Sequence, residues 1–180
     1  MSTIAIIVIL VVIVLVVLAA LGAFFILRRQ RQQSARQEFG PEYERTVQER
    51  GSARQAEREL RERRGRLERE VQPLSDESNQ RYRQRWDEEV ERTFVDNPTA
   101  SLEAADRVVT EILHERNFPT DSRGEAAKGV GVMHPDVVED FREAQSIRAE
   151  AIGPQEGGDS EKMRQAIQKY RSVYERLIER

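Results

Sequence analysis

Cysteine is absent from this chain of 180 residues. Its absence excludes disulfide frameworks, thiol catalysis and zinc sites built on thiolates, and it fits a reducing compartment. Aromatic residues are scarce at 6%, while charged residues reach 34%. Such a chain can bury only a modest core, which suits packed helices better than a sandwich or a barrel. No segment shows sustained alternation of apolar and polar residues, so we expect an all-α fold.

Histidine is limited to His114 and His134, which restricts the possible metal sites. His114 lies near the end of an expected helix and His134 precedes a proline at an expected helix start, positions that favour capping over metal binding. Glu111 and His114 match the Glu-x-x-His spacing of a di-metal carboxylate bundle once, with Glu139 or Glu143 as possible partners. A second copy of that motif is missing. We therefore predict no metal and no cofactor.

Catalytic motifs are missing from the sequence as well. The glycines of Gly129-Val130-Gly131 do not belong to a G-x-x-x-x-G-K-[ST] phosphate loop, and no strand precedes them. There is no G-x-S-x-G motif and no plausible pairing of a nucleophile with a base. The acidic runs Asp87-Glu88-Glu89 and Glu139-Asp140 would point in different directions on a helix, as on a solvated face. The sequence therefore predicts a protein that is not an enzyme.

Long apolar runs are confined to one place, residues 4–27, which read IAIIVILVVIVLVVLAALGAFFIL. A bilayer-spanning helix needs about 20 apolar residues, and this run is longer and carries no charge. The alternative is a cleaved secretory signal, but the run is long for one and no Lys or Arg precedes it. We predict a single transmembrane helix in the cell membrane.

Orientation is predicted from the charges that flank this run. Only Met1, Ser2 and Thr3 precede it, whereas four arginines follow it before the first acid, Glu38. These membrane-flanking residues are Arg28, Arg29, Arg31 and Arg36. Positive residues stay on the cytoplasmic side, so we expect the C-terminal domain in the cytoplasm. The arginines would also attract anionic lipid headgroups, although a plain stop-transfer role explains them too.

Charge is unevenly distributed over the polar region. Residues 28–72 contain 13 arginines and 9 acidic residues, a net charge of +4, whereas residues 73–180 have a net charge of −7. A proximal positive and a distal negative charge suit a domain that stands on an anionic membrane. The arginine-rich helix over 52–70 has too many acids for a nucleic-acid surface, so no nucleic-acid partner is expected.

Helical periodicity predicts the elements of the polar region. Residues 39–51 and 52–70 form a charged proximal pair, in which Phe39, Tyr43 and Val47 make one narrow stripe. Four stronger amphipathic segments follow Pro73, and they start after Ser75, at Asn97-Pro98, at His134-Pro135 and near Asp159-Ser160. Tight connections predict two antiparallel hairpins, the second joined through residues 153–159. Between the hairpins, residues 118–133 are glycine-rich and are expected to form a mobile linker with at most a short helical turn.

The first amphipathic segment carries Tyr82, Trp86, Val90 and Phe94 on one face. Tyr82, Trp86 and Phe94 could line an aromatic pocket or an interaction surface, although plain core is the simpler interpretation.

Several short motifs in this order resemble an uncharacterised family of bacterial single-pass membrane proteins, often described only as hypothetical or secreted. The motifs are Phe39-Gly40-Pro41-Glu42-Tyr43, Pro73-Leu74-Ser75, Arg81-Tyr82, Trp86, Phe94-Val95-Asp96, Pro98, Ala105-Asp106 with Val108-Val109, and His134-Pro135-Asp136-Val137-Val138. Residues 122–133 differ from the family pattern, which has a more acidic helical stretch before the His-Pro pair. The resemblance implies the fold expected above and adds no catalytic residue.

We expect a short tail at residues 1–3, a membrane helix at 4–27 and a basic juxtamembrane segment at 28–38. An Arg/Glu-rich helical pair at 39–72 and a helical bundle at 73–180 follow. The function predicted for it is that of a membrane-anchored interaction or scaffold protein, with a protein partner or with self-association. The alternative is a membrane-tethered sensor of a small ligand or metal, lined by Tyr82, Trp86 and His114.

Overall fold

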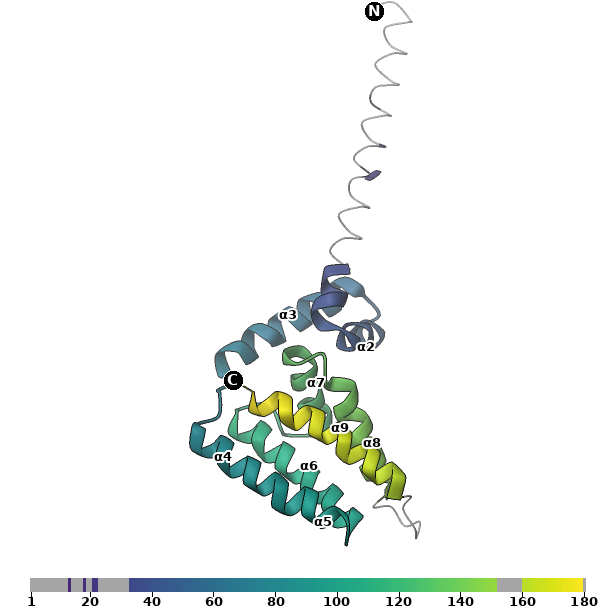
Figure 1. Cartoon of the computed structure of the whole chain (residues 1–180). Helices are drawn as coiled ribbons and strands as arrows, with labels where there is room; N and C mark the ends of the chain where they lie inside the picture. The colour runs from purple at the N-terminus through teal and green to yellow at the C-terminus, as the bar shows by residue number, and fades with distance from the viewer. Residues whose placement is uncertain (1–12, 14–17, 19–20, 23–32, 152–159, 180) are drawn as a thin grey trace, which may run out of the picture. The chain divides into compact units, whose positions relative to one another are not determined.

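A computed structural model describes residues 13, 18, 21–22, 33–151 and 160–179, and their regular structure is helical throughout, without a strand (Figure 1). This confirms the all-α prediction. The chain divides into two units, residues 1–38 and residues 39–180. Most of the run 4–27, the flanking residues Arg28, Arg29 and Arg31, and the connection 153–159 lie outside the described residues. Within the described part, no helix combines the length and the apolar character that crossing a bilayer requires.

The charged proximal pair begins the second unit as α2 (Pro41–Arg50) and α3 (Ala53–Glu70). Pro41 occupies the first turn of α2, where its missing N–H is harmless. Gly51 ends that helix in the left-handed conformation, with φ of 65°, and donates its N–H to the Val47 carbonyl at 2.8 Å. Tyr43 of α2 and Leu60 of α3 are turned inward and buried, and so is Phe39 just before α2.

The first predicted hairpin is present, but its first arm is not one regular helix. It consists of α4 (Asp76–Arg85), a π-helical segment η1 (Trp86–Glu91) and α5 (Arg92–Phe94), and it packs along α6 (Pro98–Glu115). The Ser75 and Asn97 side chains cap α4 and α6 by accepting from backbone N–H groups three residues ahead, at 3.0 Å each.

The π-helical turn accommodates the four-residue spacing of the buried face. Tyr82, Trp86 and Val90 follow one another at intervals of four, and each such step drifts about 40° around a helix of 3.6 residues per turn. The wider π-helical turn, in which the Arg92 N–H donates to the Asp87 carbonyl, absorbs this drift. All three side chains therefore remain buried, while Phe94 beyond the turn is only half-buried.

Residues 118–133 are not the linker that the sequence predicted. Helix α7 (Arg123–Met133) fills most of this stretch, with Ser122 as its N-cap. Two of its glycines permit close approaches: a Cβ on Gly129 would lie 3.2 Å from the Pro119 ring, and one on Gly131 would lie 3.0 Å from Glu42 and from Val138. The glycines that suggested mobility are places where other elements pack against the helix.

The second predicted hairpin pairs α8 (Val138–Ala151) with α9 (Ser160–Ile178), and α9 also packs along α6 (Figure 1). The core lies between these helices and η1. Its largest fully buried side chains include Tyr170, Phe141, Leu102, Ile112, Leu113 and Leu177.

Helices α2 and α3 pack against α7 and so belong to the same compact unit as the bundle. The buried Glu42 carboxylate of α2 pairs with Arg142 of α8, whose side chain is only 15% exposed. Arg63 of α3 reaches Glu125 of α7 at 3.2 Å. Polar contacts as well as apolar packing thus join the proximal pair to the bundle.

Candidate functional site

The most connected polar side chain of the described core is Asp106, which is 7% exposed. Its Oδ1 accepts a 2.7 Å hydrogen bond from the Tyr170 hydroxyl. Its Oδ2 lies 3.3 Å from Nη2 of Arg123 and 3.1 Å from Nε of Arg148. These four residues come from α6, α9, α7 and α8. One carboxylate therefore holds four helices together.

Burial of this carboxylate requires its partners, because an unpaired charge in a protein interior is strongly unfavourable. Burial, followed by the nearby Asp106 charge, raises the pKa of Tyr170 far above its usual value, so the tyrosine stays protonated and donates to Asp106. The Nε atom of Arg148 is buried and forms no hydrogen bond with a described residue, so its contact with Asp106 is an ion pair of poor hydrogen-bond geometry.

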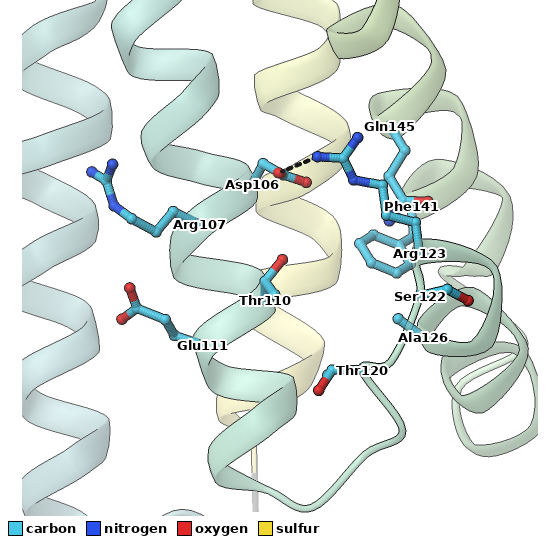
Figure 2. A pocket seen from close by; sticks show the side chains of 10 residues that line it. All are labelled: Asp106, Arg107, Thr110, Glu111, Thr120, Ser122, Arg123, Ala126, Phe141 and Gln145. Carbon is cyan, nitrogen blue, oxygen red and sulfur yellow. Dashed lines mark hydrogen bonds and ion pairs between the residues drawn. The ribbon is translucent and has the colours of Figure 1, made fainter.

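An open cavity of about 230 Å³ lies beside the Asp106–Arg123 pair. Helix α6 lines it with Asp106, Arg107, Thr110 and Glu111. The loop before α7 and its first turns add Thr120, Ser122, Arg123 and Ala126. Helix α8 supplies Phe141 and Gln145. Figure 2 shows the Arg123 guanidinium turned toward the Asp106 carboxylate. The cavity lining therefore contains two arginines, two acids, several neutral polar groups and an apolar wall.

Two of the lining residues face away from this pair. Figure 2 shows Arg107 and Glu111 directed toward the neighbouring arm of the first hairpin. Arg107 donates to Glu89 at 2.8 Å, and Glu111 pairs with Arg85. Their charges are thus used to join α6 to α4 and η1, and they leave Arg123 as the cation available to the cavity.

Two of the three aromatic residues that could line a pocket, Tyr82 and Trp86, belong to the buried core. Trp86 is 2% exposed and stacks on Tyr174, with ring centroids 4.3 Å apart. Tyr82 is buried, and its hydroxyl donates to Glu115 at 2.8 Å. Hydrogen bonds from Ser78 first, and then from Tyr82, lower the pKa of Glu115. Neither aromatic residue lines the cavity beside Asp106, and neither does the half-buried Phe94.

The histidines are separated as well. His114 is exposed and lines a different surface cavity, together with Arg63, Arg66 and Phe118. Both ring nitrogens of His134 are buried without a hydrogen-bond partner among the described residues. Burial, and then the charges of Arg116 and Arg176, lower the pKa of His134 to about 4.

His134 occupies the C-cap position of α7, and its ring makes none of the capping hydrogen bonds expected of it. Over the described residues, no group of three or more His, Asp or Glu side chains is arranged to hold a metal ion. Of the residues predicted to line a sensor site, Tyr82 and Trp86 lie in the core, and the surface cavity lined by His114 contains neither of them.

Sequence reasoning missed the four residues of the Asp106 cluster as a site. Asp106 did carry a signal, because it interrupts the apolar face formed by Leu102, Ala105 and Val109. A charged residue on a buried helix face requires a partner. Nothing in the sequence identified that partner, because Tyr170 is 64 residues away along the chain.

Comparison of the chain with protein-family models, with curated proteins and with solved structures gives no match.

Proposed function

We propose that this protein is a membrane-anchored helical interaction module, held at the cytoplasmic face by one N-terminal span. The observation that carries the proposal is the apolar run 4–27, which is long enough to cross a bilayer and is followed by arginines. Residues 28–38 join it to the compact helical unit of residues 39–180. The resemblance to bacterial single-pass membrane proteins is consistent with this order.

The charges of α3 support a role in recognition more than in stability. Its exposed ion pairs, such as Arg58–Glu62 and Arg64–Glu68, join neighbours on the same helix at 2.8 Å and 2.9 Å. Surface pairs of this kind contribute about 0–1 kcal/mol each. Such charges can be exchanged for those of a protein partner or of a second copy at little loss of stability. Arg28, Arg29, Arg31 and Arg36 would add attraction to anionic headgroups on the same side of the membrane.

Single engineered cysteines test the anchor and its orientation, because the natural chain has none. Ser2→Cys reports the N-terminal side of the span, and Ser146→Cys reports an exposed position on α8. We expect a membrane-impermeant maleimide to label the Ser2→Cys protein in intact cells and the Ser146→Cys protein only after lysis. Both proteins should stay with the membranes after alkaline carbonate extraction. Release of the intact chain by carbonate, or removal of its N-terminus, would contradict the anchor, and the reverse labelling pattern would contradict the orientation.

Crosslinking through α3 tests the interaction. Arg58 is 81% exposed, so Arg58→Cys offers a reactive thiol on the charged face without disturbing the core. A thiol-reactive photocrosslinker attached there in native membranes should give discrete adducts of a partner or of a chain dimer. The same reagent attached through Ser146→Cys on α8 is the control. Adducts that are absent, or equally abundant from both positions, would contradict recognition through α3.

A further inference from the structure

We propose that the cavity between α6, α7 and α8 binds a small organic monocarboxylate through Arg123. The inference rests on the cavity and on the Asp106 cluster, and it does not depend on membrane attachment. It assigns a ligand-binding site to a part of the bundle that the interaction proposal leaves unused.

The net charge of the groups at the cavity favours binding of an anion. Asp106 carries one negative charge, whereas Arg123 and Arg148 carry two positive charges within 3.3 Å of its Oδ2 atom. The other acid that lines the cavity, Glu111, is paired with Arg85 on the far side of α6. The cluster therefore has an excess of one positive charge, and a monoanion in the cavity would neutralise it.

Most of the N–H donors of Arg123 are available to a ligand. Its side chain is 54% exposed, and it forms one long hydrogen bond of 3.3 Å, to Asp106. A guanidinium has five N–H donors in a planar fork that matches a carboxylate. The buried Asp106 accepts from one of these donors, on Nη2, and leaves the remaining donors for a ligand. Asp106 is thus a positioning residue, and Arg123 is the binding residue.

The other lining groups restrict the ligand to a small organic acid. Thr110, Thr120 and Gln145 form no side-chain hydrogen bond with another described residue, so they can bind the oxygens of a ligand. Ala126 and Phe141 are buried apolar residues, and they suit a short hydrocarbon portion.

The volume of the cavity and the charge of the cluster restrict the class of ligand further. A volume of about 230 Å³ is below the roughly 300–1,000 Å³ of pockets for drug-sized ligands. Inorganic phosphate fits less well, because its second negative charge would exceed the single excess charge of the cluster and would approach Asp106.

Melting of the full-length protein in lipid nanodiscs tests the proposal. Trp86 is the single tryptophan and stacks on Tyr174 in the core, so its fluorescence reports unfolding. Sodium propionate and sodium lactate are titrated against sodium chloride of equal ionic strength. A ligand that binds the native state raises Tm in a saturable manner. We expect both carboxylates to do so, and inorganic phosphate to act no differently from chloride.

Two arginine variants separate binding from general electrostatics. Arg123→Gln should weaken carboxylate binding at least tenfold. Arg107→Gln is the matched control, because Arg107 also lines the cavity and its side chain is also 54% exposed, but it is directed toward Glu89. It should retain carboxylate binding within about twofold.

Thr110→Val provides a second test that leaves the Asp106 cluster intact. Thr110 is exposed, and its replacement should weaken carboxylate binding severalfold. The proposal would be overturned by a rise in Tm that does not saturate with carboxylate or that phosphate reproduces. A rise in Tm that persists in both Arg123→Gln and Thr110→Val would overturn it as well.

Discussion

Ser101 of α6 donates its hydroxyl hydrogen to the carbonyl oxygen of Val90 in the π-helical segment, at 2.7 Å and with no exposure to solvent. A π-helical turn shifts the backbone hydrogen bonds by one residue, which alters the pairing of nearby carbonyls. The serine gives the Val90 carbonyl a partner from the neighbouring helix. The irregular arm of the first hairpin is thus matched to α6 by a specific contact.

Replacement of Ser101 by alanine leaves the Val90 carbonyl buried without this partner. We expect the free energy of unfolding to fall by about 1 kcal/mol, the usual net contribution of one hydrogen bond. Denaturant unfolding followed by Trp86 fluorescence measures the change. Ser172→Ala is the control, since its hydroxyl makes only a long, exposed bond to the Gln168 carbonyl, and it should change stability by less than about 0.5 kcal/mol. Equal effects of the two substitutions would contradict the role of Ser101.

Asp106→Ala should destabilise the fold by about 3 kcal/mol or more, because it leaves Arg148 and Tyr170 without their shared buried acceptor. Asp121→Ala, in the exposed loop before α7, should have little effect. The same unfolding assay measures both. A small effect of Asp106→Ala would show that the four helices do not depend on the carboxylate.

Gly131 and Gly65 should respond in opposite directions to alanine. A Cβ on Gly131 would meet Val138 and the Glu42 carboxylate at 3.0 Å, and the pairing of Glu42 with Arg142 keeps that carboxylate in place. We expect Gly131→Ala to destabilise by about 1–2 kcal/mol. Gly65 lies inside α3 with only the flexible end of Arg69 nearby, so Gly65→Ala should stabilise by about 0.5–1 kcal/mol. Stabilisation by both substitutions would indicate that α2 does not approach α7 as closely as described.

His134 should make the protein sensitive to mild acid. Its pKa of about 4 in the folded state lies below the ordinary value of 6.5, because burial disfavours the charged ring. The unfolded chain therefore binds the proton more readily, so the stability contributed by the neutral ring is complete above pH 6.5 and is lost as pH falls to about 4. Because His134 as a whole residue is only half-buried, we expect the free energy of unfolding to fall by about 2 kcal/mol over this window.

Replacement of His134 by leucine isolates the effect of its protonation on stability. Both ring nitrogens lack partners, so His134→Leu should match or exceed natural stability at pH 7, and the difference should grow in its favour as pH falls from 6.5 to 4. His114→Leu, at an exposed position, should show no such growth. A constant difference between His134→Leu and the natural protein across this range would refute the assignment.

Much of the fold could be read from the chain. The caps at Ser75 and Asn97 and the periodic apolar faces predicted both hairpins, and these local signals lie within a few residues of what they determine. The predictions that were wrong concern contacts between elements, which no local sequence pattern reveals. Gly129 and Gly131 lower helix propensity and so suggest a linker. In α7, however, Gly129 permits a close contact with Pro119 in the preceding loop, and Gly131 permits one with Glu42 of α2. The spacing of Tyr82, Trp86 and Val90 does not predict the π-helical turn. Tyr170, Tyr174 and Ile178 have the same spacing and are buried in the regular α-helix α9.

The sequence by itself determined that this protein is helical, that its apolar run is confined to residues 4–27, and that its polar region is charged throughout. These properties depend on local periodicity and composition. Only the tertiary structure decided that Asp106, Arg123, Arg148 and Tyr170 meet, and that Trp86 and His114 do not. A polar cluster assembled from four helices has no spacing in sequence to reveal it, because packing of the apolar faces brings its members together.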